Sequence, residues 1–330
     1  MKLTFDQIHS ATKQHRLREM MLRTVQDVAQ LPNSNAKRTR CPICDAPDIA
    51  HFVQAFGFDM DRCGDCGLIF CNPYPTATQL DLYYNSEMKD FENEFFRETF
   101  EARAMLFSKR VELIRALKPS GRLLDIGSAI GIFVESLRRA QAPYEITACD
   151  LNAAACEQLA QTYGDIEILN CDAKDLDQHN AYDVVTMWDT LEHIVDLDEL
   201  LATVRRLLRP DGIFAFSTPN TDSFEWLVAG NRHVQILPPG HVNLLNTKNI
   251  VRLLEKNGFG VRDQMTLNPS LDISYVLKLL DSDPVVAGRT DAFLQNAIKD
   301  PEFQDMLSDY LVQKRMAGNV VTCAFPFPET

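Results

Sequence analysis

The chain has 330 residues, of which 45% are hydrophobic and 24% are charged, a balance that is ordinary for a globular protein. Its formal net charge of -13 argues against a protein whose main task is to grip a phosphate backbone. No apolar run reaches the roughly 18 residues that a membrane span needs, and the polar N-terminus lacks a signal-peptide core. We therefore expect a cytoplasmic protein with no membrane segment. Its nine cysteines are expected to be thiols or metal ligands rather than disulfides.

Three short segments precede the main domain. Residues 1–40 predict an N-terminal helical segment, because apolar side chains recur at helical spacing over residues 5–30 and a polar linker follows. These apolar side chains are Phe5, Ile8, Leu17, Met20, Met21, Val25 and Val28. Residues 41–75 are rich in cysteines and turns, and residues 76–118 predict a charged, aromatic helical linker or lid.

Four cysteines in the second segment form two C-x-x-C pairs, Cys41 with Cys44 and Cys63 with Cys66. Two such pairs at this separation supply four thiolates to a tetrahedral Zn²⁺, and no coordination position is left for a substrate. This predicts a zinc ribbon over residues 41–75 in which the metal is structural and replaces a core that so short a segment cannot build. Two unrelated cysteine pairs are the alternative interpretation.

The charge of the ribbon bears on its role. Its acidic residues outnumber its single basic residue, Arg62, whereas a grip on nucleic acid needs the opposite balance. The acidic residues are Asp45, Asp48, Asp59, Asp61 and Asp65. We interpret the ribbon as a scaffold or a substrate lid.

Beyond Pro119, strand-like runs alternate with amphipathic helical runs. The strand candidates are residues 122–127, 144–150, 166–172, 182–189, 212–219, 260–267 and 319–326. One helix is expected to carry Leu197 to Leu208 and to end at Pro210, and another to run from Thr247, as its N-cap, to Gly258. Such alternation predicts a mostly parallel sheet with helices on both sides. Residues 119–330 are therefore one α/β domain with a helical insertion at about 268–318.

Three acidic residues at strand ends outline a nucleoside site. Asp125 ends the first strand and is followed by a turn with Gly127 and Gly131, where the absence of a side chain lets the backbone approach a ligand. Asp150 closes the second strand, where a carboxylate accepts from ribose hydroxyls. Asp172 closes the third, next to Ala173, and suits an adenine amino group. The alternative for each aspartate is a helix cap or a turn residue.

The sequence around these residues resembles that of class I S-adenosylmethionine-dependent methyltransferases, especially the group that includes ubiquinone-pathway and sugar methyltransferases. The matching segments are LDIGSAIGIF, TACDLN, NCDAKDL, YDVVTMWDTLEHIVD, LLRPDGIFAFSTPN and GHVNLLNTKNIVRLLEKNGF. One position departs from the family pattern, since Ala129 replaces the middle glycine of the first motif. Together with the four-cysteine ribbon, the match is similar to enzymes that methylate nucleotide-linked deoxysugars at carbon.

The resemblance implies a Rossmann-like, seven-stranded methyltransferase sheet whose last, antiparallel strand is residues 319–326. It implies that S-adenosylmethionine is bound by Asp125, Gly127, Gly131, Asp150, Leu151, Asp172, Ala173, Trp188 and Asp189. It also implies His193 and His241 as catalytic residues, and an imidazole suits proton removal because it titrates near neutral pH. A structural hydrogen bond is the alternative for each histidine, and which of them is the base stays open.

The expected function is methyl transfer to a small-molecule acceptor, with a nucleotide-linked sugar or a polysaccharide precursor as one candidate. Pro238-Pro239-Gly240 departs from the sugar-enzyme pattern, so C-, O- and N-methylation remain open. A nicotinamide dehydrogenase should show G-x-G-x-x-G, which the turn at Gly127 lacks. A nucleic-acid or protein methyltransferase that uses the ribbon for recognition is the main alternative, and a non-catalytic binding module is a third. The sequence predicts no oligomeric state.

Overall fold

The computed structural model describes residues 11–328, without the side chains of residues 11–15, Asp90 and Phe95. The expected N-terminal helix is observed as α2 (Ala11–Gln30), while Phe5 and Ile8 lie outside the described residues. The chain forms two compact units. Unit 1 comprises Met1–Ser86, Thr218–Ile250 and Gln264–Val321, and unit 2 comprises Glu87–Ser217, Val251–Asp263 and Thr322–Thr330.

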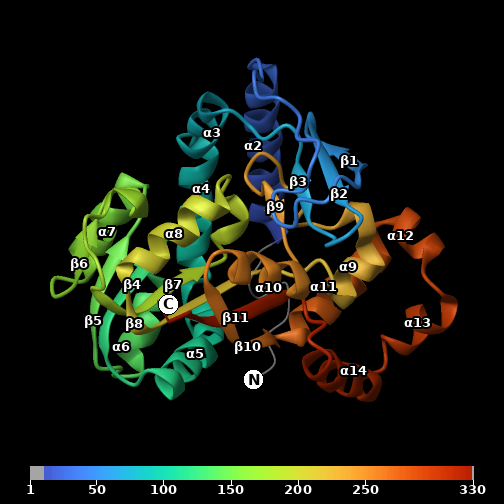
Figure 1. Cartoon of the computed structure of the whole chain (residues 1–330). Helices are drawn as coiled ribbons and strands as arrows, with labels where there is room; N and C mark the ends of the chain where they lie inside the picture. Colours follow the sequence, from blue (N-terminus) through green and yellow to red (C-terminus); the bar gives the residue numbers. More distant parts are fainter. Residues whose placement is uncertain (1–10, 329–330) are drawn as a thin grey trace. The chain divides into compact units, whose positions relative to one another are not determined.

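The larger sheet has seven strands in the order β10-β11-β8-β7-β4-β5-β6 (Figure 1). The strands are β4 (Gly121–Ile126), β5 (Tyr144–Cys149), β6 (Glu167–Leu169), β7 (Tyr182–Trp188), β8 (Leu208–Pro219), β10 (Phe259–Leu267) and β11 (Asn319–Pro326). Strands β4 to β8 pair in parallel, and β11 runs antiparallel. The predicted sheet class and its antiparallel last strand are confirmed.

Helices cover both faces of this sheet, since all seven residues of β7 are buried. The helices and 3-10 turns of the parallel part are α4 (Glu87–Glu98), α5 (Phe100–Leu117), α6 (Ile132–Arg139), α7 (Ala153–Thr162), η1 (Ala173–Asp175), η2 (Leu191–His193), α8 (Leu197–Leu207) and α10 (Thr247–Lys256). Helix α5 packs against α6 (Figure 1).

Two predicted helix boundaries are wrong. Helix α8 ends at Leu207, because Leu208 already belongs to β8 and pairs with Tyr182. The Pro210-Asp211-Gly212 segment lies within β8, at a point where the register of its pairing with β7 shifts. The N-cap of α10 is Asn246 rather than Thr247, since the Asn246 Oδ1 atom accepts from the backbone N–H groups of Lys248 and Asn249.

A smaller antiparallel sheet contains the cysteine segment. Its order is β1-β2-β3-β9, formed by β1 (Ile49–Ala55), β2 (Phe58–Cys63), β3 (Ile69–Cys71) and β9 (Asn243–Leu244). Strand β9 comes from a part of the chain far from the other three and lies beside β3 in Figure 1. The ribbon sheet is therefore completed by residues that the cysteine spacing did not indicate.

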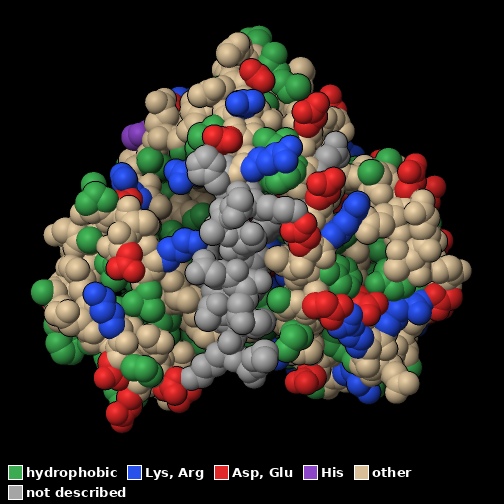
Figure 2. Space-filling model, turned by 180° about the vertical axis from the view of Figure 1, so that it is seen from behind, with side chains coloured by type: hydrophobic (Ala, Val, Ile, Leu, Met, Phe, Trp, Pro, Cys, Tyr) green, Lys and Arg blue, Asp and Glu red, His purple; other side chains and the backbone are tan. Residues whose placement is uncertain are grey.

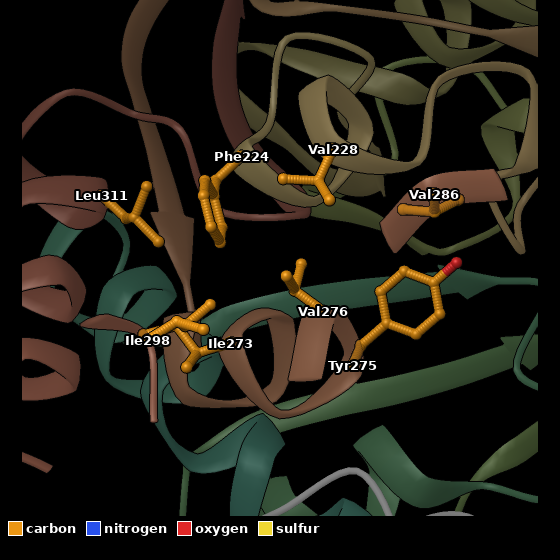
Figure 3. Packing of buried hydrophobic residues seen from close by; sticks show 8 residues of the cluster. All are labelled: Phe224, Val228, Ile273, Tyr275, Val276, Val286, Ile298 and Leu311. Carbon is orange, nitrogen blue, oxygen red and sulfur yellow. The ribbon is translucent and has the colours of Figure 1, made fainter. Parts of the chain in front are cut away.

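The remaining helices belong to unit 1, where α3 contacts α2 and the helices from α9 onward share a buried core. They are α3 (Ala77–Tyr84), α9 (Phe224–Ala229), η3 (Gly230–Arg232), α11 (Pro269–Ser282), α12 (Pro284–Arg289), α13 (Ala292–Ala297) and α14 (Pro301–Gln313). Figure 3 shows Phe224 and Val228 of α9 pointing toward Ile273 and Val276 of α11. Tyr275, Val286, Ile298 and Leu311 complete this buried cluster. The helices between β10 and β11 thus pack on α9 through apolar side chains.

None of the helices within residues 11–328 has the length and apolar character that a bilayer crossing requires.

Candidate functional site

Asp125 ends β4 and is fully enclosed in unit 2. Its Oδ1 atom accepts a 2.7 Å hydrogen bond from the Thr186 hydroxyl on β7, and the Ser128 hydroxyl donates to its backbone oxygen. Burial raises the pKa of Asp125 to about 7, against the opposing effect of the hydrogen bond from Thr186. The carboxyl is thus held in one orientation at the carboxyl edge of the parallel strands.

The turn after β4 uses left-handed backbone at three alternate residues. Gly127 and Gly131 have φ of 75° and 81°, and Ala129 between them has φ of 45°. A side chain at Gly127 would lie 2.6 Å from the Thr190 hydroxyl, so glycine is required there for space as well as conformation. Gly131 is the N-cap of α6, which begins at Ile132.

Asp150 connects this turn to the end of β5. Its Oδ2 atom accepts from the backbone N–H of Ala129 at 2.8 Å, and its Oδ1 atom accepts from the backbone N–H of Asn152 at 2.8 Å. Burial raises the pKa of the Asp150 carboxyl despite these two bonds. The next residue, Leu151, is 72% exposed. An apolar side chain exposed to solvent beside a half-buried carboxylate is available to cover a flat ligand.

Asp172 follows β6 and caps η1. Its Oδ1 atom accepts from the backbone N–H of Lys174 at 3.1 Å, and the Lys174 ammonium lies 3.4 Å from Oδ2. Ala173 is buried beside it. The capping alternative is therefore present at Asp172, and its contact with an adenine group stays a prediction.

Trp188 and Asp189 end β7. The indole of Trp188 is buried and packs edge-on against Phe133, with ring centroids 5.1 Å apart. Asp189 has φ of 51°, and its Oδ1 atom accepts from the Ser217 hydroxyl at 2.9 Å. Its Oδ2 atom lies 3.4 Å from a guanidinium nitrogen of Arg110 on α5.

Arg110 is a residue that the sequence did not single out. It is 5% exposed, and its guanidinium lies over the Phe107 ring with 4.0 Å between the guanidinium carbon and the ring centroid. Its Nε and Nη1 atoms have no hydrogen-bond partner among the described residues. Buried donors without acceptors are uncommon, and they mark positions where a ligand or water completes the bonding. A lone arginine on a helix gives no sequence signal for this.

His193 and His241 lie in different units. His193 is half-buried at the end of η2, where its backbone N–H donates to the Thr190 carbonyl at 3.1 Å. His241 is half-buried in unit 1, and its Nδ1 atom lies 3.0 Å from the carbonyl oxygen of Gln235. A carbonyl only accepts, so Nδ1 carries the proton and Nε2 carries the lone pair of the neutral ring.

The four predicted metal cysteines come together. The Sγ atoms of Cys41 and Cys66 are 3.6 Å apart, as are those of Cys44 and Cys63, and all four lie within 4.8 Å of one another. A tetrahedral ion with metal–sulfur distances of about 2.3 Å separates its sulfurs by about 3.8 Å. Cys71 and His51 are not part of this cluster.

Parallel strands that end in Asp125, Asp150 and Asp189 around a left-handed turn define a nucleoside-type cofactor domain. The family described as "Methyltransferase domain" matches residues 96–264. The chain is similar to the ubiquinone biosynthesis O-methyltransferases of Cronobacter sakazakii, at 29% identity over 50% of this chain and 76% of the relative, and of Colwellia psychrerythraea, at 26% over 47% and 72%.

Among solved structures, the chain resembles the complex between the Haloferax volcanii Trm112 methyltransferase activator and the putative methyltransferase. The TM-score is 0.50 at 15% identity, over 72% of this chain and 95% of that one. The chain belongs to the class I S-adenosylmethionine-dependent methyltransferases. The roles of its individual residues remain predictions.

Proposed function

We propose that this methyltransferase acts on a small molecule and binds its methyl donor on unit 2 through nine residues. These are Asp125, Gly127, Gly131, Asp150, Leu151, Asp172, Ala173, Trp188 and Asp189. The bond from Ala129 to Asp150 carries the proposal, because it fixes a half-buried carboxylate against a glycine turn of the kind that lets a ligand approach the backbone. S-adenosylmethionine, when bound, supplies an electrophilic methyl group. The residues around it bind, orient and exclude water.

We add Arg110 to this set as the partner of an anionic group. Its Nε and Nη1 donors lack acceptors, and the Asp189 carboxylate contacts only the remaining guanidinium nitrogen, Nη2. The donor carries a carboxylate on its methionine moiety, and an arginine pairs with a carboxylate through two parallel donors. Arg110 therefore suits that carboxylate better than it suits the adenosine end.

We propose His241 as the base that takes a proton from the acceptor. For a hydroxyl acceptor, the O–H bond breaks and its proton moves to Nε2, while the oxygen forms the new bond to the methyl carbon. The carbon–sulfur bond breaks, and its electron pair stays on sulfur as the neutral thioether. The bond from Nδ1 to the Gln235 carbonyl supports this role, since it orients the ring and leaves Nε2 as the basic atom.

The acceptor class follows from several observations together. The relatives named above are O-methyltransferases, which favours a hydroxyl acceptor. The likeness of the ribbon and motifs to sugar methyltransferases makes a nucleotide-linked sugar or a polysaccharide precursor the specific candidate. The ribbon is acidic, and acidic and basic side chains are interspersed on the face drawn in Figure 2. This balance favours a small molecule over nucleic acid.

We propose that Cys41, Cys44, Cys63 and Cys66 hold a structural Zn²⁺. The Sγ separations are close to those of a tetrahedral four-thiolate site, which supports the assignment. With all four positions filled by protein sulfur, the metal would take no part in methyl transfer and would hold the two knuckles of the ribbon together.

The test is calorimetry with S-adenosylhomocysteine, followed by product mass analysis with hydroxyl acceptors that do or do not contain a nucleotide-linked sugar. The wild-type protein should bind S-adenosylhomocysteine, and Asp150→Ala should abolish that binding. Ala160→Gly, an exposed change on α7, should not affect it. No binding by the wild-type protein would remove the basis for the donor site. Methylation of only the sugar-free acceptors would refute the sugar assignment alone.

A further inference from the structure

The segment that carries His241 is built into the ribbon sheet. Strand β9 follows His241 by two residues and pairs with β3, with Ile69 opposite Leu244 and Phe70 opposite Asn243. The backbone N–H of Cys71 also donates to the carbonyl of Val242 at 2.9 Å. The main chain next to His241 is therefore held by the strand that follows the second cysteine pair.

Side chains strengthen the same connection. The Tyr74 hydroxyl donates a 2.7 Å hydrogen bond to the Oδ1 atom of Asn243, and both residues are buried. The Cys71 thiol lies 3.9 Å from the carbonyl oxygen of His241 itself. A buried bond of this kind is costly to lose because its partner is left without water.

Asn246 links this segment to a metal cysteine. Its Nδ2 atom donates to the carbonyl of Cys66 at 3.1 Å, while its Oδ1 atom caps α10. Asn249 adds a second donor to the same carbonyl at 3.4 Å. Both asparagines are buried, at 3% and 0% exposed. One buried amide thus connects the Cys63–Cys66 knuckle to the start of α10, five residues after His241.

We infer that Asn246 is a positioning residue through which the metal knuckle sets the geometry of His241. The inference rests on the proposed role of His241 as base. The ribbon has too little apolar core to keep its knuckles in place without the metal. Loss of the metal therefore releases the Cys66 carbonyl, then the Asn246 amide and the β3–β9 pairing. The cysteine ribbon in this sense positions the proposed base.

The sharpest variant is Asn246→Asp, which keeps the oxygen that caps α10, removes the donor to Cys66 and places a charged oxygen opposite the Cys66 carbonyl. The matched control is Asn33→Asp, which removes a donor to the ribbon carbonyl of Tyr74 and touches neither Cys66 nor the His241 segment. The main readout is the imidazole NMR signal of His241, assigned by its disappearance in His241→Gln. It is recorded in the zinc-loaded protein, after treatment with a zinc chelator, and in both variants.

We expect the His241 signal to shift on chelation and in Asn246→Asp, and to stay in place in Asn33→Asp. In Asn246→Asp we also expect kcat to fall about 10- to 100-fold, as a small misplacement of a catalytic group causes. KM for the acceptor and the affinity for S-adenosylhomocysteine should change less than twofold.

An unchanged His241 signal in Asn246→Asp would overturn the inference, even if chelation unfolds the ribbon. The proposed role of His241 as base is tested separately, because normal turnover by His241→Gln would refute it. The NMR comparison would still show whether Asn246 connects the metal knuckle to His241.

Discussion

The backbone N–H of Ala129 donates to the Oδ2 atom of Asp150 at 2.8 Å, and this bond joins the turn after β4 to the end of β5. It is made by a residue with φ of 45°, in the left-handed region that only glycine adopts without cost. The family pattern has glycine at this position. The alanine therefore keeps the bond in a strained conformation.

Replacing Ala129 by glycine should stabilise the protein. Relief of the left-handed conformation, less the added flexibility of the unfolded chain, predicts a gain of about 1 kcal/mol in the free energy of unfolding. Urea unfolding measures it, and affinity for S-adenosylhomocysteine should be unchanged. The same substitution at Ala160, exposed within α7, should instead lose about 1 kcal/mol. A loss in both variants would show that the Ala129 methyl group is needed for packing.

The grouping of the proposed donor residues at one edge of the sheet was predictable because these residues occur at strand ends. Asp125 and Asp150 follow buried apolar runs, and parallel strands bring their carboxyl ends to one edge. The clustering of the four cysteines was predictable for a similar reason, since two short spacings and one intermediate spacing bring them together. In both cases the spacing of the residues along the chain is enough to predict which of them lie together.

Other features leave no such pattern. Strand β9 has two residues, too few for an alternating pattern, and its partner β3 is about 170 positions away. Arg110 is one of many basic residues on helices, and only its burial and unpaired donors distinguish it. Asn246 and Thr247 are both good N-caps, and the sequence gives no sign that Asn246 also donates to the Cys66 carbonyl.

Removal of the buried Arg110 guanidinium is expected to weaken the binding of ligands that carry a carboxylate, and of those alone. Arg110→Met keeps the apolar contact with Phe107 and removes the charge, so the affinity for S-adenosylhomocysteine should fall at least about tenfold. The affinity for methylthioadenosine, which lacks the amino-acid carboxylate, should stay the same. Calorimetry with both ligands measures the difference. Arg139→Met, an exposed arginine on α6, is the control and should affect neither ligand. An equal loss for both ligands would place Arg110 away from the carboxylate.

Asp125 predicts a particular pH dependence of stability. Burial raises its pKa to about 7, above the value of about 3.9 for an unfolded chain. Between these values the folded state binds more protons than the unfolded state, so stability falls as the pH rises from about 4 to about 7. Nearby Asp150 reinforces the shift and Arg110 opposes it.

Asp125→Asn should remove this component. Urea unfolding of both proteins at pH 5 and pH 8 should show a smaller decrease in the variant than in the wild type. Thr186 keeps a hydrogen-bond partner in the variant, which limits other losses. The same decrease in both proteins would mean that Asp125 is ionised throughout this range.

The largest loss of stability is expected for a substitution at Gly318, because a β-carbon there would meet two buried carboxyl groups. Its backbone N–H donates to Asp272 Oδ2 at 2.8 Å, and a β-carbon there would overlap Glu225 Oε1 and lie 2.8 Å from Asp272 Oδ1. Both carboxyl groups are buried, and burial raises the pKa of each. Glu225 is also fixed by His233, whose Nε2 atom donates at 3.1 Å because its Nδ1 atom accepts from Gln235. A β-carbon at residue 318 would therefore displace carboxyl groups that are each held by a hydrogen bond.

Gly318→Ala should therefore lose about 3 kcal/mol in the free energy of unfolding, the upper range for an overpacked site. Gly288→Ala is the matched control, since Gly288 lies in α12 and a β-carbon there meets no atom within 4 Å. Alanine is the better helix former, so this variant should gain about 0.5–1 kcal/mol. Urea unfolding of the two variants beside the wild type separates the effects. A loss below about 1 kcal/mol in Gly318→Ala would mean that the Glu225 and Asp272 carboxyl groups separate readily, and that this buried cluster is not rigid.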